Sequence, residues 1–479
     1  MKRDQDLVSS NVISRRSLSR AAASALSCLA LAGCIAEPAE SDPSTETENT
    51  AEAKEDLVTN CGYTSPGIDF GREVLITDLS VVNDPCRTTF NAPNCPPGSA
   101  GAWTFARLMT AMAGTTPPAQ FVADWLHGWE INQTVNGLPM PARPGVRPAL
   151  IDKWLQASGC APGTPIVGPG ACALDLTKAP FRLLSISNRV DIGGVVGAGG
   201  PGEGRFVFGA FDLGNGAPIP ATVIFEYSLP TALNTFVWAQ KFHALAATPF
   251  GPTYNANLQA VTDLFAGAGA QPGNGNGGSS IGQVRTNEIA FGPVWEWREQ
   301  RLTVVPGGST ANEMLRATTV KETPANNTNN TPPLNSWMTA NAAGILAETA
   351  SVPATWNGVP LLGGASQAPP GFVWQGPLPP PDGRHLFGLG TCNGCHTNET
   401  ATAFTHVGPR PPNQRAPLSP FMAVSAAPNA TGNLPAQVFT FRDATGVTRQ
   451  YNEPWRRVCE MRRLLAGDPT PWSKRSGAH

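Results

Sequence analysis

The sequence predicts an α+β fold, with a Gly/Pro-rich body of mixed helices and antiparallel strands and a small, mainly helical and loop-rich C-terminal region. The chain has 50 Gly and 47 Pro among 479 residues, a composition that favours turns and irregular loops between short elements. Only 14% of the residues are charged and 41% are hydrophobic, which is enough apolar mass to bury a sizeable core. The strand-like runs cluster instead of alternating regularly with helices, and this argues against a doubly wound sheet.

The individual elements follow from hydrophobic periodicity. Apolar side chains at three-to-four spacing predict helices, and runs rich in Val, Ile, Phe and Trp that are bounded by Gly or Pro predict strands. Pro-containing segments at 324–333 and 377–381 are expected to be loops or boundaries. We expect helices at 102–113, 120–129, 148–158, 233–247 and 255–266, and strands at 181–190, 204–213, 221–227, 283–291 and 294–304.

Charge and composition exclude two classes of protein. The formal net charge is -2, from 33 Lys and Arg against 35 Asp and Glu, and no basic run is present. A nucleic-acid-binding protein would show a basic excess or basic patches. A disordered chain would lack apolar residues, whereas this one holds 12 Trp and 20 Phe.

The N-terminus carries an export signal. Arg15, Arg16 and Arg20 precede residues 21–33, an apolar run too short to span a bilayer, which takes roughly 20 residues. This is the pattern of a signal peptide. The run ends in Leu31-Ala32-Gly33-Cys34, which resembles a bacterial lipobox. The resemblance implies that Cys34 becomes the new N-terminus and carries a lipid, and the alternative, an ordinary cleaved signal, implies export as well.

Four segments are therefore expected along the chain. Residues 1–33 are the lipoprotein signal peptide, and residues 34–60, rich in acidic residues, Pro, Ser and Thr, are an extended flexible tether. Residues 61–379 are the α+β body, whose function the sequence does not specify. Residues 380–479 are the small C-terminal region that carries the motif described below.

Two motifs of the body match enzyme patterns but lack the structural context that those patterns require. Residues 197–202 match the dinucleotide-binding pattern GxGxxG, yet the residues that follow are expected to form a strand and not a helix. Residues 278–282 match the nucleophile-elbow pattern GxSxG, yet a Gly/Asn-rich linker precedes them in place of a strand. Both are expected to be loops.

Charged residues occur within or beside the apolar strands, at Arg189, Asp191, Glu226, Arg285 and Glu288. Buried charges need partners of opposite sign. We expect a structural ion-pair network here, and the alternative is a polar functional pocket at the same place.

One motif carries chemistry. The pentad Cys392-Asn393-Gly394-Cys395-His396 is the attachment signature of haem c. The two thiols add to the vinyl groups of the porphyrin, two intervening residues match the vinyl separation, and the adjacent His396 becomes the proximal iron ligand. The alternative, a redox disulfide between the two cysteines, lacks a thioredoxin-like context. The sequence therefore predicts one covalent haem c.

The flanks of the pentad resemble class I c-type cytochromes over roughly the last hundred residues. Residues 383–387 lead into the motif, a Gly-Pro pair follows at 408–409, and 453–466 resembles the C-terminal helix of that family. The resemblance implies that the carbonyl of Pro409 accepts the ring N–H of His396. As a whole, the chain also resembles a group of bacterial lipoproteins that carry this pentad near the C-terminus.

The sixth iron ligand stays open at this point. Class I cytochromes supply a methionine from a downstream loop. Met461 has nearly that spacing but lies in a predicted helix, Met422 lies in a loop closer to the pentad, and His406 follows His396 by ten residues. His406 and Met422 are equal candidates, and an open site is the third alternative. A ligated iron favours electron transfer, whereas an open site permits peroxide or oxygen chemistry.

The remaining cysteines are even in number. With Cys28 lost in the signal and Cys34 lipidated, six cysteines remain outside the pentad, and an exported protein is expected to pair them. Proximity suggests Cys86–Cys95 and Cys160–Cys172, which leaves Cys61–Cys459 to link the two ends of the mature chain.

Three functional hypotheses follow. The first is a lipid-anchored monohaem c-type cytochrome of the bacterial cell envelope, facing the periplasm or the cell surface, that transfers one electron to a redox partner protein or a small-molecule oxidant or reductant. The second is a haem c-dependent peroxidase or oxygenase with a substrate between the body and His396. The third is an envelope binding or structural lipoprotein without a redox role. None of them involves nucleic acid.

Overall fold

The computed structural model describes residues 61–193, 200–379, 382–426 and 438–468, and its centre is one antiparallel sheet. The predicted signal peptide, Cys34, the tether and residues 197–199 lie outside the described residues. The strands run in the order β1-β4-β5-β6-β7-β8-β12, and β9 also pairs with β8. Their bounds are β1 Leu75–Ile76, β4 Phe181–Arg189, β5 Glu203–Phe211, β6 Pro218–Ser228, β7 Ile281–Glu288, β8 Trp295–Thr303, β9 Met314–Thr318 and β12 Ala365–Ala368.

The two faces of this sheet differ in chemistry. Successive side chains of a strand point to opposite faces, and the strands alternate apolar and polar residues. Directly opposed Ile186, Phe206 and Phe225 occupy one face. The other face carries Arg205 opposite Glu226, together with polar side chains of β4 and β7. Both faces are buried, although the polar face of an antiparallel sheet is commonly solvated.

Helices cover the apolar face and complete the largest hydrophobic core. Phe105 of α2 stacks on Phe181 of β4 with ring centroids 4.2 Å apart, and Trp154 of α4 meets the same pair edge-on. The early helices predicted from the sequence therefore bury their apolar stripe against the sheet. These elements are α1 Leu79–Val82, α2 Phe105–Met112, α3 Pro118–Glu130, the π-helical turn η2 Arg147–Ile151, α4 Asp152–Ala157, α5 Thr235–His243, α6 Pro252–Ala266 and α7 Gly275–Gly278.

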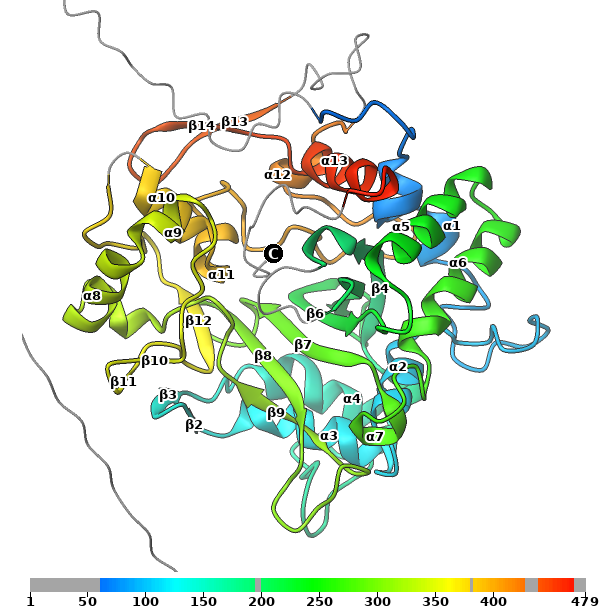
Figure 1. The fold of residues 1–479 in the computed structure, drawn as a ribbon. Helices are drawn as coiled ribbons and strands as arrows, with labels where there is room; N and C mark the ends of the chain where they lie inside the picture. The colour runs from blue at the N-terminus through cyan, green and yellow to red at the C-terminus, as the bar shows by residue number, and fades with distance from the viewer. Residues whose placement is uncertain (1–60, 194–199, 380–381, 427–437, 469–479) are drawn as a thin grey trace, which may run out of the picture. The chain divides into compact units, whose positions relative to one another are not determined.

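The C-terminal segment, which comprises the described residues from 382 to 468, lies against the polar face of the sheet (Figure 1). Its helix α11 packs on β12, and its last helix α13 packs on α5. All described residues belong to one compact unit. The remaining elements are α8 Pro332–Ala340, α9 Ala342–Leu346, α10 Asp382–Leu389, α11 Cys392–Cys395, α12 Pro420–Ala423 and α13 Glu453–Leu465, with short hairpins β2 Gln133–Val135 and β3 Leu138–Met140, β10 Thr355–Trp356 and β11 Val359–Pro360, and β13 Phe439–Arg442 and β14 Thr448–Tyr451.

The α+β class is confirmed, and the predicted elements agree with the observed ones to within a few residues. Neither enzyme-like pattern has the context that its motif requires. The second, residues 278–282, is not the loop that was expected, because it spans the end of α7 and the start of β7. The described end of the first, residues 200–202, leads straight into β5, a strand. In the second, the Ser280 hydroxyl donates to the carbonyl of Phe265. No helix among the described residues is long and apolar enough to cross a bilayer.

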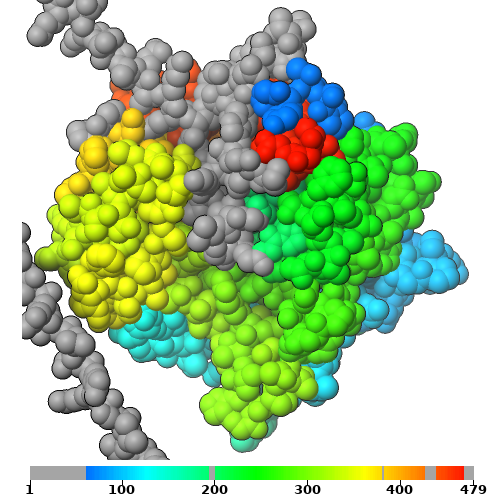
Figure 2. Space-filling model, in the orientation of Figure 1, coloured from blue at the N-terminus to red at the C-terminus, as the bar shows by residue number. Residues whose placement is uncertain are grey.

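Three disulfides join the cysteines outside the pentad in the pairs that proximity suggests. Cys86–Cys95 and Cys160–Cys172 close short loops, whereas Cys61–Cys459 joins positions 398 residues apart. The first described residues (blue) therefore lie on helix α13 (red) in the space-filling view (Figure 2). This bridge fixes α13 to the start of the described chain.

The charged residues singled out in the strands are paired, but in three separate clusters. Asp191 bonds to Arg189 and to Arg456 of α13 at 2.8 and 3.0 Å. Glu226 and Glu299 share Arg285, each at 3.2 Å. A third cluster consists of Glu288 and Arg143, 2.6 Å apart. Each buried carboxylate of these clusters therefore has a cation beside it, as desolvation requires.

We expect the long-range disulfide to contribute more stability than a local one. In the chain-entropy account, removing the pair separated by 398 residues costs about 6 kcal/mol, against about 3 kcal/mol for the pair separated by nine. Urea unfolding of Cys61→Ala/Cys459→Ala, compared with Cys86→Ala/Cys95→Ala, measures the difference. Equal losses would contradict this account.

Asp191 should make stability depend on acid pH. Burial alone would raise the pKa of Asp191, but Arg189 and Arg456 outweigh burial and hold that pKa below its ordinary value. The stabilisation is thus complete above the ordinary pKa of about 4 and is lost as the pH falls below it. At pH 7 we expect Asp191→Asn to cost about 3 kcal/mol or more in urea unfolding, and its stability should fall less than the wild type's between pH 5 and pH 3. Asp124→Asn, in a more exposed pair with Arg316, is the control and should cost about 1 kcal/mol or less.

Candidate functional site

The pentad forms one helical turn, α11. The side chain of Thr391 caps it by accepting a hydrogen bond from Gly394 N at 3.1 Å. The turn packs so closely on α10 that a Cβ on Gly394 would stand 2.0 Å from the carbonyl oxygen of Gly388. Only glycine fits there, because any side chain at position 394 would meet the backbone of α10. The close packing of the two helices thus fixes the turn that separates Cys392 from Cys395.

The two cysteines of the turn are thiols and form no disulfide. Cys392 packs beside Trp295 and Trp297 of β8, and burial raises the pKa of its thiol to about 11, with Arg285 acting in the opposite sense. Cys395 is equally buried, and its Sγ lies 3.3 Å from Nε2 of His406. Both sulfurs are protected from water by the surrounding side chains.

His396 is held in one orientation by the loop that follows it. Its Nδ1–H donates to the carbonyl oxygen of Phe404 at 2.8 Å, and the rings of Trp295 and Trp297 lie 5.7 and 4.6 Å away. Burial lowers the pKa of His396 to about 4, so the ring is neutral at pH 7. The lone pair of Nε2 is therefore available to bind a metal.

The expected role of Pro409 is wrong. Phe404, not Pro409, supplies the carbonyl, because the chain turns back toward His396 at Phe404, whose backbone is left-handed with φ of 67°. Pro409 lies instead against the backbone of Gly209 in β5. The turn comes eight residues after His396, too soon for the later Gly-Pro pair to reach the ring.

Asn287 of β7 fixes the same carbonyl from the sheet side. Its side-chain amide donates to Phe404 O at 2.7 Å and accepts from Trp295 Nε1 at 2.6 Å. The amide of Asn287 and the imidazole of His396 thereby share the carbonyl oxygen of Phe404, and the indole of Trp295 is linked to it through the amide. The sheet thus positions His396 as directly as the pentad loop does.

A cavity with about 730 Å³ of atom-free space adjoins this network. One wall is the polar face of the sheet, which contributes Arg205, Thr222, Arg285 and Asn287. The opposite wall belongs to the C-terminal segment, with Arg457 of α13 among its residues. The described lining is Leu75, Ser187, Arg205, Val207, Thr222, Ile224, Arg285, Asn287, Trp297, Cys395, His396, His406, Val407, Phe421, Met422 and Arg457.

Three arginines line the cavity. Arg205, Arg285 and Arg457 are the described lining residues that carry a full charge. Each also pairs with a carboxylate outside the lining: Arg205 and Arg285 pair with Glu226, and Arg457 pairs with Glu453. Burial lowers the pKa of Arg457 to about 10, which leaves it charged at pH 7. Nη2 of Arg285 is buried without a hydrogen-bond partner among the described residues, and such an orphaned donor is costly unless a ligand satisfies it.

The structure brings the candidate iron ligands His406 and Met422 to this cavity and excludes Met461. His406 lies with its ring centroid 4.6 Å from that of His396, and its Nδ1 is 2.9 Å from Ser419 Oγ. Met422 is buried in α12 and lines the cavity. Met461 is buried in the large core, on α13.

Sequence reasoning missed the sheet side of the site. The signal was present in the polar residues Arg205, Thr222 and Glu226, which alternate with aromatic and aliphatic residues of the other face, although Val207 and Ile224 interrupt the polar series. This alternation indicates that one face of the sheet is polar. A polar face of an antiparallel sheet is ordinarily expected to contact solvent, and the pattern was therefore not interpreted as part of a site. Two interpretations of the charged strand residues were open, and this cavity agrees with the second, a polar functional pocket at Arg285.

A buried cluster near the pentad also contains metal-ligand residue types. His385, Glu399 and Asp443 have side-chain atoms within 4.8 Å of one another. However, Arg384 bonds to both carboxylates, and Arg449 bonds to Asp443 at 3.0 Å. These cations already neutralise the carboxylates, so the cluster is interpreted as a structural ion-pair network.

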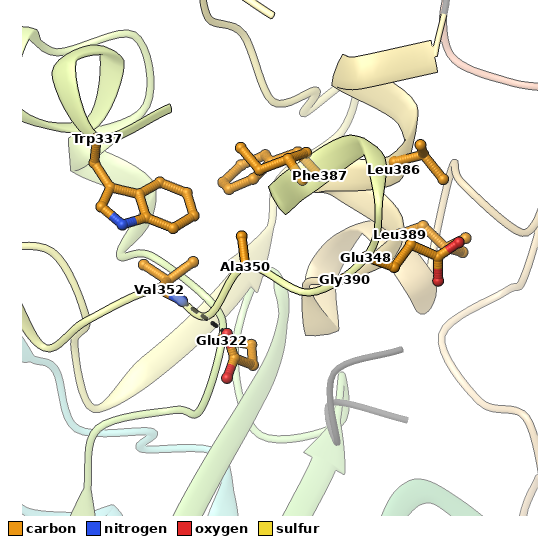
Figure 3. A pocket seen from close by; sticks show the side chains of 10 residues that line it. Glu322, Trp337, Glu348, Ala350, Val352, Leu386, Phe387, Leu389 and Gly390 are labelled. Carbon is orange, nitrogen blue, oxygen red and sulfur yellow. Dashed lines mark hydrogen bonds between the residues drawn. The ribbon is translucent and has the colours of Figure 1, made fainter. Parts of the chain in front are cut away.

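A second cavity lies between α9 and α10 (Figure 3). It is lined mainly by apolar side chains, including Trp337 and Phe387. Its carboxylate Glu322 accepts hydrogen bonds from Ser351 Oγ at 2.6 Å and Val352 N at 2.8 Å. This cavity lies within the second hydrophobic cluster and contains none of the predicted site residues.

Loss of the Asn287 amide should destabilise the site side of the sheet. In Asn287→Leu the buried indole N–H of Trp295 loses its acceptor, and we expect a cost of about 2 kcal/mol in urea unfolding. Asn257→Leu, at an exposed amide of α6, is the matched control and should change stability by about 0.5 kcal/mol or less. Equal effects of the two changes would show that the Asn287 network is not stabilising.

Comparison with known proteins finds nothing similar. No family model matches this chain, and neither a curated protein nor a solved structure matches it. What the cavity binds is therefore inferred from its own residues.

Proposed function

We propose that this chain is a lipid-anchored monohaem c-type cytochrome that transfers one electron at a time in the bacterial cell envelope. The observation that carries the proposal is the placement of His396. Its ring is neutral, is held through Nδ1, and lines a cavity beside Cys395.

The residues fit the requirements of haem c. Covalent attachment needs two thiols one helical turn apart, and Cys392 and Cys395 meet this condition without being joined to each other. The two propionates of haem need hydrogen-bond donors, and Arg285 at the cavity wall offers a buried Nη2–H without a hydrogen-bond partner among the described residues.

Each part of the site has a separate task in this proposal. Cys392 and Cys395 would hold the group covalently, and His396 would ligate its iron through Nε2. Arg205 and Arg285 would pair with the carboxylates of the haem, and Trp297 would exclude water from the surroundings of His396. Haem c, when bound, supplies an iron that gains and loses one electron.

The orientation of His396 bears on the redox potential. A hydrogen bond from Nδ1–H to a carbonyl makes the ring a stronger donor to a metal. Because Phe404 O is itself fixed by Asn287 at 2.7 Å, this effect is built into the fold. A rigid iron ligand would also lower the reorganisation energy that accompanies the gain or loss of an electron, and a low reorganisation energy suits an electron carrier.

Membrane attachment is the second part of the proposal and rests on the sequence. The lipobox-like run ending at Cys34 and the acidic residues up to position 60 would hold the described unit outside the cytoplasm by a lipid and a polar tether. That compartment is also the one in which three disulfides persist. A redox partner protein or a small-molecule oxidant or reductant would exchange the electron.

Haem attachment is tested by the pyridine haemochrome assay on protein produced with the haem c maturation machinery. We expect one haem c per chain in the wild type and none in Cys392→Ser/Cys395→Ser. The control Cys86→Ser/Cys95→Ser also exchanges two cysteines, but outside the pentad, and it should keep the haem. A wild-type chain without covalent haem would exclude the cytochrome and the haem-enzyme hypotheses together.

We expect Met422 to be the sixth ligand. Both ring nitrogens of His406 already have a neighbouring atom, since Nδ1 lies near Ser419 Oγ and Nε2 lies near Cys395 Sγ. Met422, in contrast, lines the cavity, and its uncharged thioether sulfur binds haem iron more readily than it binds water. Met422→Ala should convert the low-spin absorption spectrum to a high-spin one, and His406→Ala should leave it low-spin. A high-spin spectrum in the unmutated protein would favour the peroxidase or oxygenase hypothesis instead.

A further inference from the structure

A third cavity is lined by Trp295, the ring that stacks on His396. It has about 960 Å³ of atom-free space, and three loops that are distant in sequence form it. These are the β7–β8 turn with the start of β8, the segment that follows β12, and the loop that follows the pentad. The lining consists of Ile289, Pro293, Val294, Trp295, Ala368, Pro369, Pro370, Gly371, Phe372, Thr397, Asn398, Ala401, Thr402, Ala403 and Phe404.

The chemistry of this lining specifies an uncharged aromatic ligand. No lining residue is charged, and the side chains are mainly proline, small aliphatic residues and the three aromatic rings of Trp295, Phe372 and Phe404. Aromatic walls favour a planar ring stacked or edge-on to them. A charged ligand would lose its hydration there without gaining a counter-ion.

One polar group is placed to orient such a ligand. The side-chain nitrogen of Asn398 donates to Phe372 O at 2.9 Å, which leaves the amide oxygen Oδ1 as an acceptor at the cavity wall. An acceptor in an apolar site selects for a ligand with a hydroxyl group. A phenolic compound satisfies both the aromatic walls and this acceptor.

The backbone of the pentad loop gives an independent reason to regard the cavity as a site. Two of its lining residues that are not glycine have left-handed backbones, Ala401 with φ of 47° and Phe404 with φ of 67°. A left-handed conformation is strained for such residues and is concentrated at functional sites. The conformation at Phe404 places its ring parallel to Trp295, with centroids 6.1 Å apart, and its carbonyl on His396.

We propose that this cavity is a binding site for a small, uncharged aromatic molecule that carries a hydroxyl group. Trp295, which lines this cavity, also stacks on the imidazole of His396 at 5.7 Å. The site does not depend on the proposed haem, since the described residues alone form its walls. If the proposed function is correct as well, the ligand lies one aromatic ring away from His396 and is a candidate for the small-molecule redox partner.

Equilibrium dialysis of the purified full-length chain tests this with two probes that share one ring system, neutral 2-naphthol and anionic naphthalene-2-sulfonate. We expect 2-naphthol to bind at one site and the sulfonate at least tenfold more weakly. Asn398→Leu, which removes the acceptor, should weaken 2-naphthol about tenfold, a ratio that corresponds to one lost hydrogen bond.

Blocking the cavity gives the second arm. Ala403→Trp places a large side chain at an exposed position of the cavity rim and should abolish binding of 2-naphthol. Ala343→Trp, on the exposed side of α9, should leave binding unchanged, which shows that an added tryptophan is not itself the cause. Retained binding in Ala403→Trp, or equal affinity for the two probes, would overturn the proposal.

The haem-free variant Cys392→Ser/Cys395→Ser separates this proposal from the proposed function. Binding of 2-naphthol in that variant supports the cavity whether or not the wild type carries haem. Loss of binding in that variant, with binding kept in Ala403→Trp, would place the probe at the haem and overturn the aromatic site alone.

Discussion

The structure depends on one constraint, which is that both faces of the antiparallel sheet are buried although one of them is polar. Arg205, Glu226, Arg285, Asn287 and Glu299 lie on this face with almost no exposure. Desolvated charges and amides are tolerated only with hydrogen-bond or ion-pair partners. The C-terminal segment that covers the face must therefore supply a partner for each polar group that the sheet itself does not satisfy. The carbonyl of Phe404, fixed by Asn287, and Arg456, which bonds to Asp191 at the end of β4, are such partners. The cavity is the part of the face where this matching is incomplete.

Local patterns explain why the elements could be predicted from the sequence. Periodicity of 3.6 or 2 is a property of neighbouring residues, and it placed α2 to α6 and β4 to β8 within a few residues of their observed bounds. Short strands such as β1 and β12 were missed because pairing with distant β4 and β8 holds them in place, not their own composition. The fold class therefore follows from the sequence, whereas the edges of the sheet follow from tertiary contacts.

The site was predictable only on the side of the pentad. Cys392, Cys395 and His396 belong to a pattern with fixed spacing, and His406 and Met422 were found because they follow it along the chain. The partner of His396 was assigned wrongly, to Pro409, since a left-handed turn at an aromatic residue such as Phe404 has no local sequence signal. The sheet residues Arg205 and Asn287 lie up to 191 positions away from the pentad, and no spacing rule connects them to it.

The shared cavity has a consequence for how the protein matures. Its lining runs from Leu75 to Arg457, so neither the sheet nor the C-terminal segment can form it alone, and a fragment starting near residue 380 would lack one wall. Both thiols of the pentad are almost completely inaccessible in the folded chain, so the proposed attachment of haem would have to precede the docking of the C-terminal segment on the sheet. Under that proposal, covalent attachment and final folding are ordered in time.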